Sequence, residues 1–117
     1  MPEKKQIPKL DWYCPLYAGP KLAVQKKRLI RKLNHNAVRP DLYLITFAAN
    51  GQDLFDILSS AYLKQPALRR NLPEIVGIAQ GREEAVALVQ QILEETLQET
   101  GAADVKAYLR QHRQNKK

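Results

Sequence analysis

The sequence predicts a small α/β domain of two or three layers, with a short parallel sheet built on a βαβ core and about four helices. Two short apolar runs, at 42–50 and 74–81, are bounded by turn residues, as is typical of strands buried on both faces. A segment with helical periodicity follows each run. At 117 residues the chain fits one domain of common size.

The first 20 residues are predicted to form an extended arm, ahead of a single domain at 21–112 and a flexible basic tail at 113–117. Four of the seven prolines lie in the arm, and proline removes an amide donor and disfavours helix at the preceding residue. The arm also contains an aromatic cluster, WYCPLY, that is too apolar for a free tail. We expect it to pack on the domain or on a second copy of the chain, with base stacking as an alternative role. The candidate residues for self-association are Trp12, Tyr13 and Tyr17.

Residues 21–34 show the periodicity of an amphipathic basic helix. At about 100° per residue, Leu29 and Leu33 fall on one side with other apolar residues, and most of the cations fall on the other. Lys26 inside the apolar arc and Val24 among the charges make the pattern imperfect. The candidate contacts to a nucleic acid or an acidic partner are the cations of this helix and one just beyond it: Lys27, Arg28, Arg31, Lys32 and Arg39.

The run at 42–50 predicts the first strand, and the residues after it predict a helix. Asn50 is expected to cap a helix from Gly51 to about Lys64, whose apolar residues recur on one face.

The run at 74–81 predicts the second strand. The connection at 50–73 is long enough for a right-handed crossover, so the two strands are expected side by side and parallel. Two strands alone make a poor sheet. Either the arm near 7–16 adds a third strand, or a second copy of the chain completes a larger sheet.

Two helices are predicted after the second strand. The first runs from Arg82 to about Thr100, with acidic residues in its first turn and Gly101 as its C-terminal stop. The second begins at Asp104 and frays into the basic tail.

Ligands of parallel α/β sheets bind outside the carboxyl ends of the strands, where helix N-termini present free amides. Both predicted strands end in a turn that contains glycine, which allows an anion to approach the backbone closely. Neither turn matches a nucleotide-binding glycine motif. The candidate anion-binding residues are Asn50, Gly51, Gln80, Gly81 and Arg82.

The net charge of +7 is unevenly distributed. Residues 1–39 carry ten Lys/Arg against two Asp/Glu, whereas residues 40–104 carry four against ten. The last thirteen residues add five cations. A chain that is basic at both ends and acidic in the middle suits a polyanionic partner, but its ends could equally neutralise its own centre.

The residues that usually carry chemistry form no recognisable set. Cys14 is the single cysteine, and neither histidine has a partner at metal-ligand spacing, so no metal, cofactor or catalytic residue is predicted. Glu94, Glu95 and Glu99 are expected on a solvated helix face. No apolar run is long enough for a membrane span, and the N-terminus lacks a secretory signal, so a cytoplasmic location is expected.

Taken together, these patterns favour a non-enzymatic binding or accessory domain for an anionic partner, with nucleic acid as one candidate. Two alternatives stay open. One is a ligand-binding or enzymatic domain that uses the strand-end turns, and the other is a homodimeric interaction protein that uses the aromatic arm.

Overall fold

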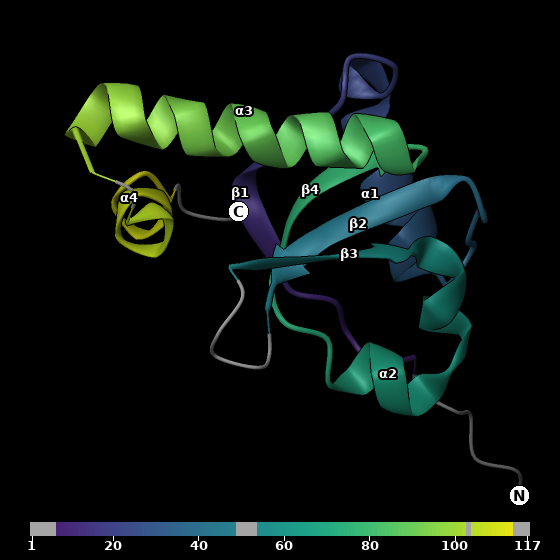
Figure 1. Ribbon diagram of the computed structural model, residues 1–117. Coiled ribbons are helices and arrows are strands. Elements are labelled where there is room, and N and C mark those ends of the chain that lie inside the picture. Colours follow the sequence, from purple (N-terminus) through teal and green to yellow (C-terminus); the bar gives the residue numbers. More distant parts are fainter. Residues whose placement is uncertain (1–6, 49–53, 103, 114–117) are drawn as a thin grey trace, which may run out of the picture.

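The computed structural model describes residues 7–48, 54–102 and 104–113. Its strands are β1 (Trp12–Ala18), β2 (Leu42–Phe47), β3 (Phe55–Ser59) and β4 (Ile75–Gln80). Its α-helices are α1 (Lys26–Asn34), α2 (Pro66–Arg70), α3 (Arg82–Thr100) and α4 (Val105–Gln111), and two 3-10 segments are η1 (Ala23–Gln25) and η2 (Ser60–Lys64). The strands form one mixed sheet in the order β1-β4-β2-β3 (Figure 1). The fold is therefore the small α/β domain with a parallel strand pair that the sequence predicts.

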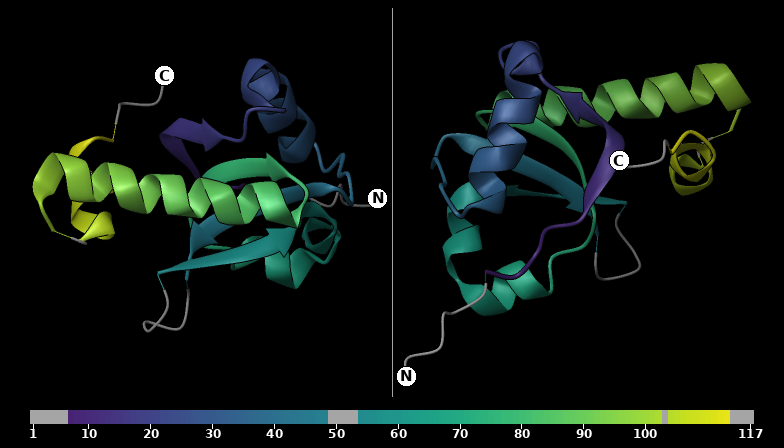
Figure 2. Two further views of the ribbon diagram at one scale, coloured as in Figure 1. Left: turned by 45° about the horizontal axis from the view of Figure 1, so that its top comes forward. Right: turned by 180° about the vertical axis from the view of Figure 1, so that it is seen from behind.

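The sheet separates two hydrophobic cores, because successive strand residues face opposite sides. Leu44 of β2 packs in one core with Leu29 and Leu33 of α1, and η2 closes the same side. The next residue, Ile45, packs in the other core with residues of α3 and α4 such as Leu88. The domain thus has three layers, with α1 on one face of the sheet and α3 on the other (Figure 2).

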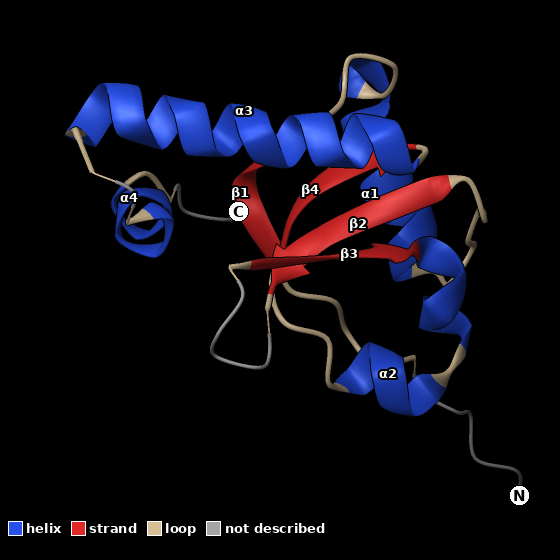
Figure 3. Cartoon of the chain, viewed as in Figure 1, coloured by secondary structure: helices blue, strands red, loops and turns tan. Residues whose placement is uncertain are grey.

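The two predicted strands are neighbours, but their predicted parallel direction is wrong. Leu44 of β2 lies opposite Ile78 of β4 in an antiparallel ladder. The parallel pair is β1 with β4 instead. The direction changes because β3 forms an antiparallel pair with β2 and turns the chain back, so the connection to β4 is not a simple βαβ crossover (Figure 3).

The predicted helix from 51 to 64 is also wrong over its described part. Phe55–Ser59 is the strand β3, and Ser60–Lys64 is a 3-10 helix. The apolar residues of a short segment fit a period of two as well as a helical period, so periodicity alone does not separate the two. The expected cap, Asn50, lies outside the described residues. The sequence did contain a signal for a strand pair in place of a helix, because the dipeptide Asn50–Gly51 between two apolar runs favours a chain reversal.

The other predicted helices are confirmed. Helix α3 has the predicted bounds, and Gly101 ends it with a left-handed φ of 71° that glycine adopts without strain. The Asp104 carboxylate caps α4 by accepting from the amide of Ala107. Helix α1 begins at Lys26, after the short segment η1. Helix α2, which begins at Pro66, was not predicted.

The N-terminal arm supplies the third strand, one of the two alternatives that the sequence allows. Strand β1 pairs with β4 at the edge of the sheet, where the missing amide of Pro15 interrupts no inner ladder.

Glu95 belongs to α3 and links this helix to the edge strand β1 and to helix α4. It was predicted to be solvated, but it is half-buried and accepts hydrogen bonds from the hydroxyls of Tyr17 in β1 (2.5 Å) and Tyr108 in α4 (2.9 Å). The carboxylate accepts a hydrogen bond from each phenol hydroxyl, and its negative charge disfavours a phenolate beside it. It therefore favours the neutral form of both tyrosines.

These tyrosines make the fold sensitive to alkali. Burial and the hydrogen bond to Glu95 raise the pKa of Tyr108 to about 12, and the same causes raise the pKa of Tyr17. The unfolded chain releases these protons near pH 10 while the folded chain keeps them, so we expect the free energy of unfolding to fall as the pH rises from about 10 to 12. Denaturant titrations at several pH values measure the fall. It should be shallower when Tyr17 and Tyr108 are both changed to phenylalanine, and an equally steep fall in that variant would contradict the prediction.

Candidate functional site

Helix α1 presents a row of cations on the outer face of the domain. Leu29 and Leu33 are 2% and 0% exposed and hold the helix against the sheet. Lys26, which interrupts the apolar arc, donates from Nζ to the carbonyl oxygen of Leu16. The side chains that remain on the solvent side are Lys27, Arg28, Arg31 and Lys32.

The layer to which α1 belongs is built from segments without acidic residues. The sequence has no Asp or Glu between Asp11 and Asp41, and none between Asp56 and Glu74. These two stretches form α1, η2 and α2 in this layer, together with β1 of the sheet. Helix α3, on the opposite face of the sheet, carries five glutamates. Helix α4 on that opposite face adds the cations Lys106 and Arg110, so acidic and basic groups are mixed there, whereas the described helices of the α1 layer carry cations alone.

The cations of α1 have no acidic partner in the described part of the chain. The ion pairs there join Arg39 to Asp41 (3.1 Å) and Arg113 to Glu74. The structure thus gathers four of the five predicted contact cations on one helix face. The fifth, Arg39, is partly neutralised, because its Nε and Nη2 both donate to Asp41.

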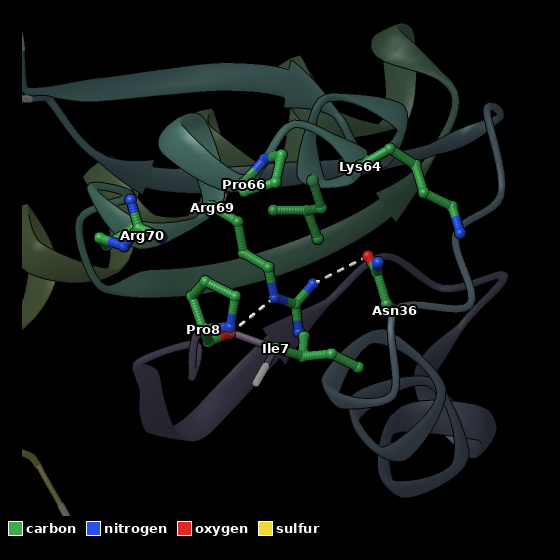
Figure 4. A pocket seen from close by; sticks show the side chains of 8 residues that line it. Ile7, Pro8, Asn36, Lys64, Pro66, Arg69 and Arg70 are labelled. Carbon is green, nitrogen blue, oxygen red and sulfur yellow. Dashed lines mark hydrogen bonds between the residues drawn. The ribbon is translucent and has the colours of Figure 1, made fainter. Parts of the chain in front are cut away.

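A cavity of about 470 Å³ lies at the C-terminal end of α1 (Figure 4). Its apolar lining consists of Ile7, Pro8, Leu63 and Pro66, and its polar lining consists of Asn36, Lys64, Arg69 and Arg70. Among the residues that the structure describes, the polar side includes three cations and no carboxylate. A volume of this size is within the range of small-molecule sites, roughly 300–1,000 Å³.

Arg69 forms the inner wall of this cavity and is 1% exposed. Its guanidinium donates to the carbonyl oxygens of Leu33 (2.8 Å), Asn34 (3.2 Å) and Pro8 (2.6 Å), and to Oδ1 of Asn36 (3.3 Å). Two of these carbonyls belong to the last turn of α1, where helix carbonyls lack intrahelical partners. Arg69 therefore caps α1, and its acceptors are all neutral. Burial lowers its pKa without removing its charge.

The predicted strand-end residues are only partly brought together. Gln80, Gly81 and Arg82 lie at the N-terminus of α3, but the amide of Gln80 donates to the carboxylate of Glu84 (2.8 Å). The amide of Gly81 donates to the carbonyl of Asp41 (2.8 Å). Because β2 and β4 are antiparallel, the end of β2 lies at the opposite end of β4 from this turn. Asn50 and Gly51 lie outside the described residues.

The aromatic candidates for self-association pack within the domain itself. Trp12 and Tyr13 are 8% and 1% exposed. The indole of Trp12 donates to Oδ1 of Asn34, and the hydroxyl of Tyr13 donates to the carbonyl of Leu109. Tyr17 is half-buried beside Glu95.

Sequence reasoning missed the cavity and the residues that line it. Arg69 and Arg70 are adjacent and both follow Pro66, yet one is buried and the other exposed. No local signal distinguishes them, since their roles depend on the distant C-terminus of α1. Asn36 carried a weak signal, because asparagine tolerates the positive φ of 66° that it adopts just after the helix.

No protein-family model matches the chain, and comparisons with curated proteins and with solved structures found no significant match. Among the described residues, no helix has the length and apolarity needed to cross a membrane. The same residues contain no cluster of three or more His, Cys, Asp or Glu side chains that could hold a metal ion. The class that the fold and the site define is a three-layer α/β domain with one cationic face.

Proposed function

We propose that this domain binds nucleic acid through α1 and contacts phosphates rather than bases. The observation that carries this proposal is the row of four exposed cations, Lys27, Arg28, Arg31 and Lys32, which have no acidic partner among the described residues. Phosphate contacts supply most of the affinity of non-specific binding.

The spacing of these cations supports a phosphate partner. A helix rises about 1.5 Å per residue, so the four cations from Lys27 to Lys32 occupy roughly 7.5 Å of its axis. This is about one positive charge per 2 Å of helix axis, a dense row of cations that suits a polyanion such as DNA.

The rigid seating of α1 also supports the proposal. Its apolar face is buried, Arg69 caps its C-terminal carbonyls, and Asn34 bonds to Trp12 of the edge strand. A surface that is already ordered loses less conformational freedom when it binds.

The test is the salt dependence of binding to a short fluorescein-labelled DNA duplex, measured by anisotropy. Four phosphate contacts predict a slope of log K against log salt of about −3.6, which is a loss of about 150-fold in affinity between roughly 50 and 200 mM salt. With Arg28→Gln and Arg31→Gln together, the slope should be about −1.8 and the loss about 12-fold.

The matched control is Lys106→Gln with Arg110→Gln on α4. These residues are exposed, and their replacement removes the same charge from the opposite face. We expect this variant to keep the parent's slope. Equal slopes in the two variants, or no binding by the parent at low salt, would refute the proposal.

A further inference from the structure

The geometry points to a second anion site in the cavity at the C-terminal end of α1, and we infer that it binds a phosphomonoester group with an attached organic part. The inference goes beyond the proposed function, because the cavity is lined by none of the four cations on α1 and is argued from its own lining residues. In Figure 4 the guanidinium of Arg69 lies between Pro8 and Asn36, with Lys64 and Arg70 to either side.

The polar groups of the cavity can donate hydrogen bonds but have little capacity to accept them. Lys64 and Arg70 carry donors only, as does every ammonium or guanidinium group. The Oδ1 of Asn36 already accepts from Arg69, which leaves its amide hydrogens to donate. Arg69 has five N–H groups and gives four hydrogen bonds to described residues. A ligand that complements this wall must accept hydrogen bonds, as an oxyanion does.

The charge of the cavity favours phosphate over carboxylate. Three cations line it, and neither Lys64, Arg69 nor Arg70 has an acidic partner in the described part of the chain. A carboxylate brings one negative charge, whereas a phosphomonoester brings about 1.5 to 2 at neutral pH and three terminal acceptor oxygens. Arg69 also covers the C-terminal carbonyls of α1, whose negative dipole end would otherwise repel an anion.

The apolar side of the cavity explains why we infer an organic phosphate rather than the inorganic ion alone. Pro8, Leu63 and Pro66 form a wall next to the cations. The volume of about 470 Å³ exceeds what a phosphate group fills. Small-molecule sites combine such an apolar wall with a few convergent polar groups. A phosphomonoester of this kind is present in a free mononucleotide and at the phosphorylated end of a nucleic-acid strand.

Calorimetry with AMP and with adenosine tests the site, and fluorescent oligonucleotides with a 5′-phosphate or a 5′-hydroxyl separate the two sources. We expect AMP or the phosphorylated oligonucleotide to bind better than its phosphate-free counterpart. Preference only among the oligonucleotides identifies a strand end as the ligand, and binding of AMP identifies a free phosphomonoester. No preference for phosphate in either pair would overturn the inference.

The variant that tests the assignment is Lys64→Gln with Arg70→Gln, because both side chains are exposed and the fold should persist. It should weaken the phosphate-dependent binding about tenfold or more, since charge-assisted hydrogen bonds are lost. Lys106→Gln with Arg110→Gln removes the same charge from α4 and should leave this binding unchanged. An equal loss in both variants would show a general charge effect and overturn the cavity site. The binding of a DNA duplex by the Arg28→Gln, Arg31→Gln variant tests only the proposed function of α1. The cavity site and the proposed function can therefore be refuted independently.

Discussion

Replacement of Arg69 by alanine is expected to lower the free energy of unfolding by about 3 kcal/mol, because buried acceptors lose their donors. The guanidinium joins three parts of the chain: the segment at Pro8, the end of α1 and helix α2. Without it, the carbonyls of Leu33 and Asn34 lose a charge-assisted hydrogen bond at the end of α1, and the Leu33 carbonyl keeps that from the amide of Asn36 (3.0 Å). The loss is a large share of the roughly 5–15 kcal/mol of stability typical of a domain.

Chemical denaturation measures this effect, and the chain supplies its own control. Arg70 follows Arg69 directly but is exposed, so Arg70→Ala should change stability little. The stability of Arg69→Lys should lie between those of Arg69→Ala and Arg70→Ala. The lysine ammonium keeps the charge, but it lacks the planar guanidinium that donates to several carbonyls at once. Equal stability of the Arg69→Ala and Arg70→Ala variants would disprove the capping role.

Leu33→Ala is expected to cost about 3 kcal/mol of stability, since a buried leucine leaves both a transfer loss and a cavity. Leu33 is 0% exposed and packs between α1 and the sheet, beside Leu29 and Leu44. The same substitution should also weaken nucleic-acid binding. Without the Leu33 side chain, α1 is held less firmly against the sheet, and its four cations lose their fixed spacing.

The control for this prediction is Val24→Ala, just ahead of α1. Val24 is 95% exposed and has no core to leave, so its replacement should stay within about 0.5 kcal/mol of the parent. Thermal unfolding of the three proteins gives the comparison. A Leu33→Ala variant as stable as Val24→Ala would mean that α1 does not dock through its apolar stripe.

The sequence by itself determined the features that depend on near neighbours. Periodicity and terminal residues predict the charge of α1, the bounds of α3, the stop at Gly101 and a further helix from about Asp104. The buried strands at 42–47 and 75–80 follow from apolar runs between turns. Each of these signals lies within a few residues of the structure that it predicts.

Only the tertiary structure decided which way β2 and β4 run, that Phe55–Ser59 is a strand, and that Arg69 rather than Arg70 is buried. The same holds for Glu95, whose partners are 78 and 13 residues away in the chain. The direction of a strand, the layer of a helix and the burial of a side chain depend on contacts between segments that are far apart in the sequence. The free energies of such contacts cannot be inferred from a short stretch of residues. The cationic face exists for the same reason: the helices α1 and α2, from two acid-free stretches far apart in the chain, meet at Arg69 on one side of the sheet.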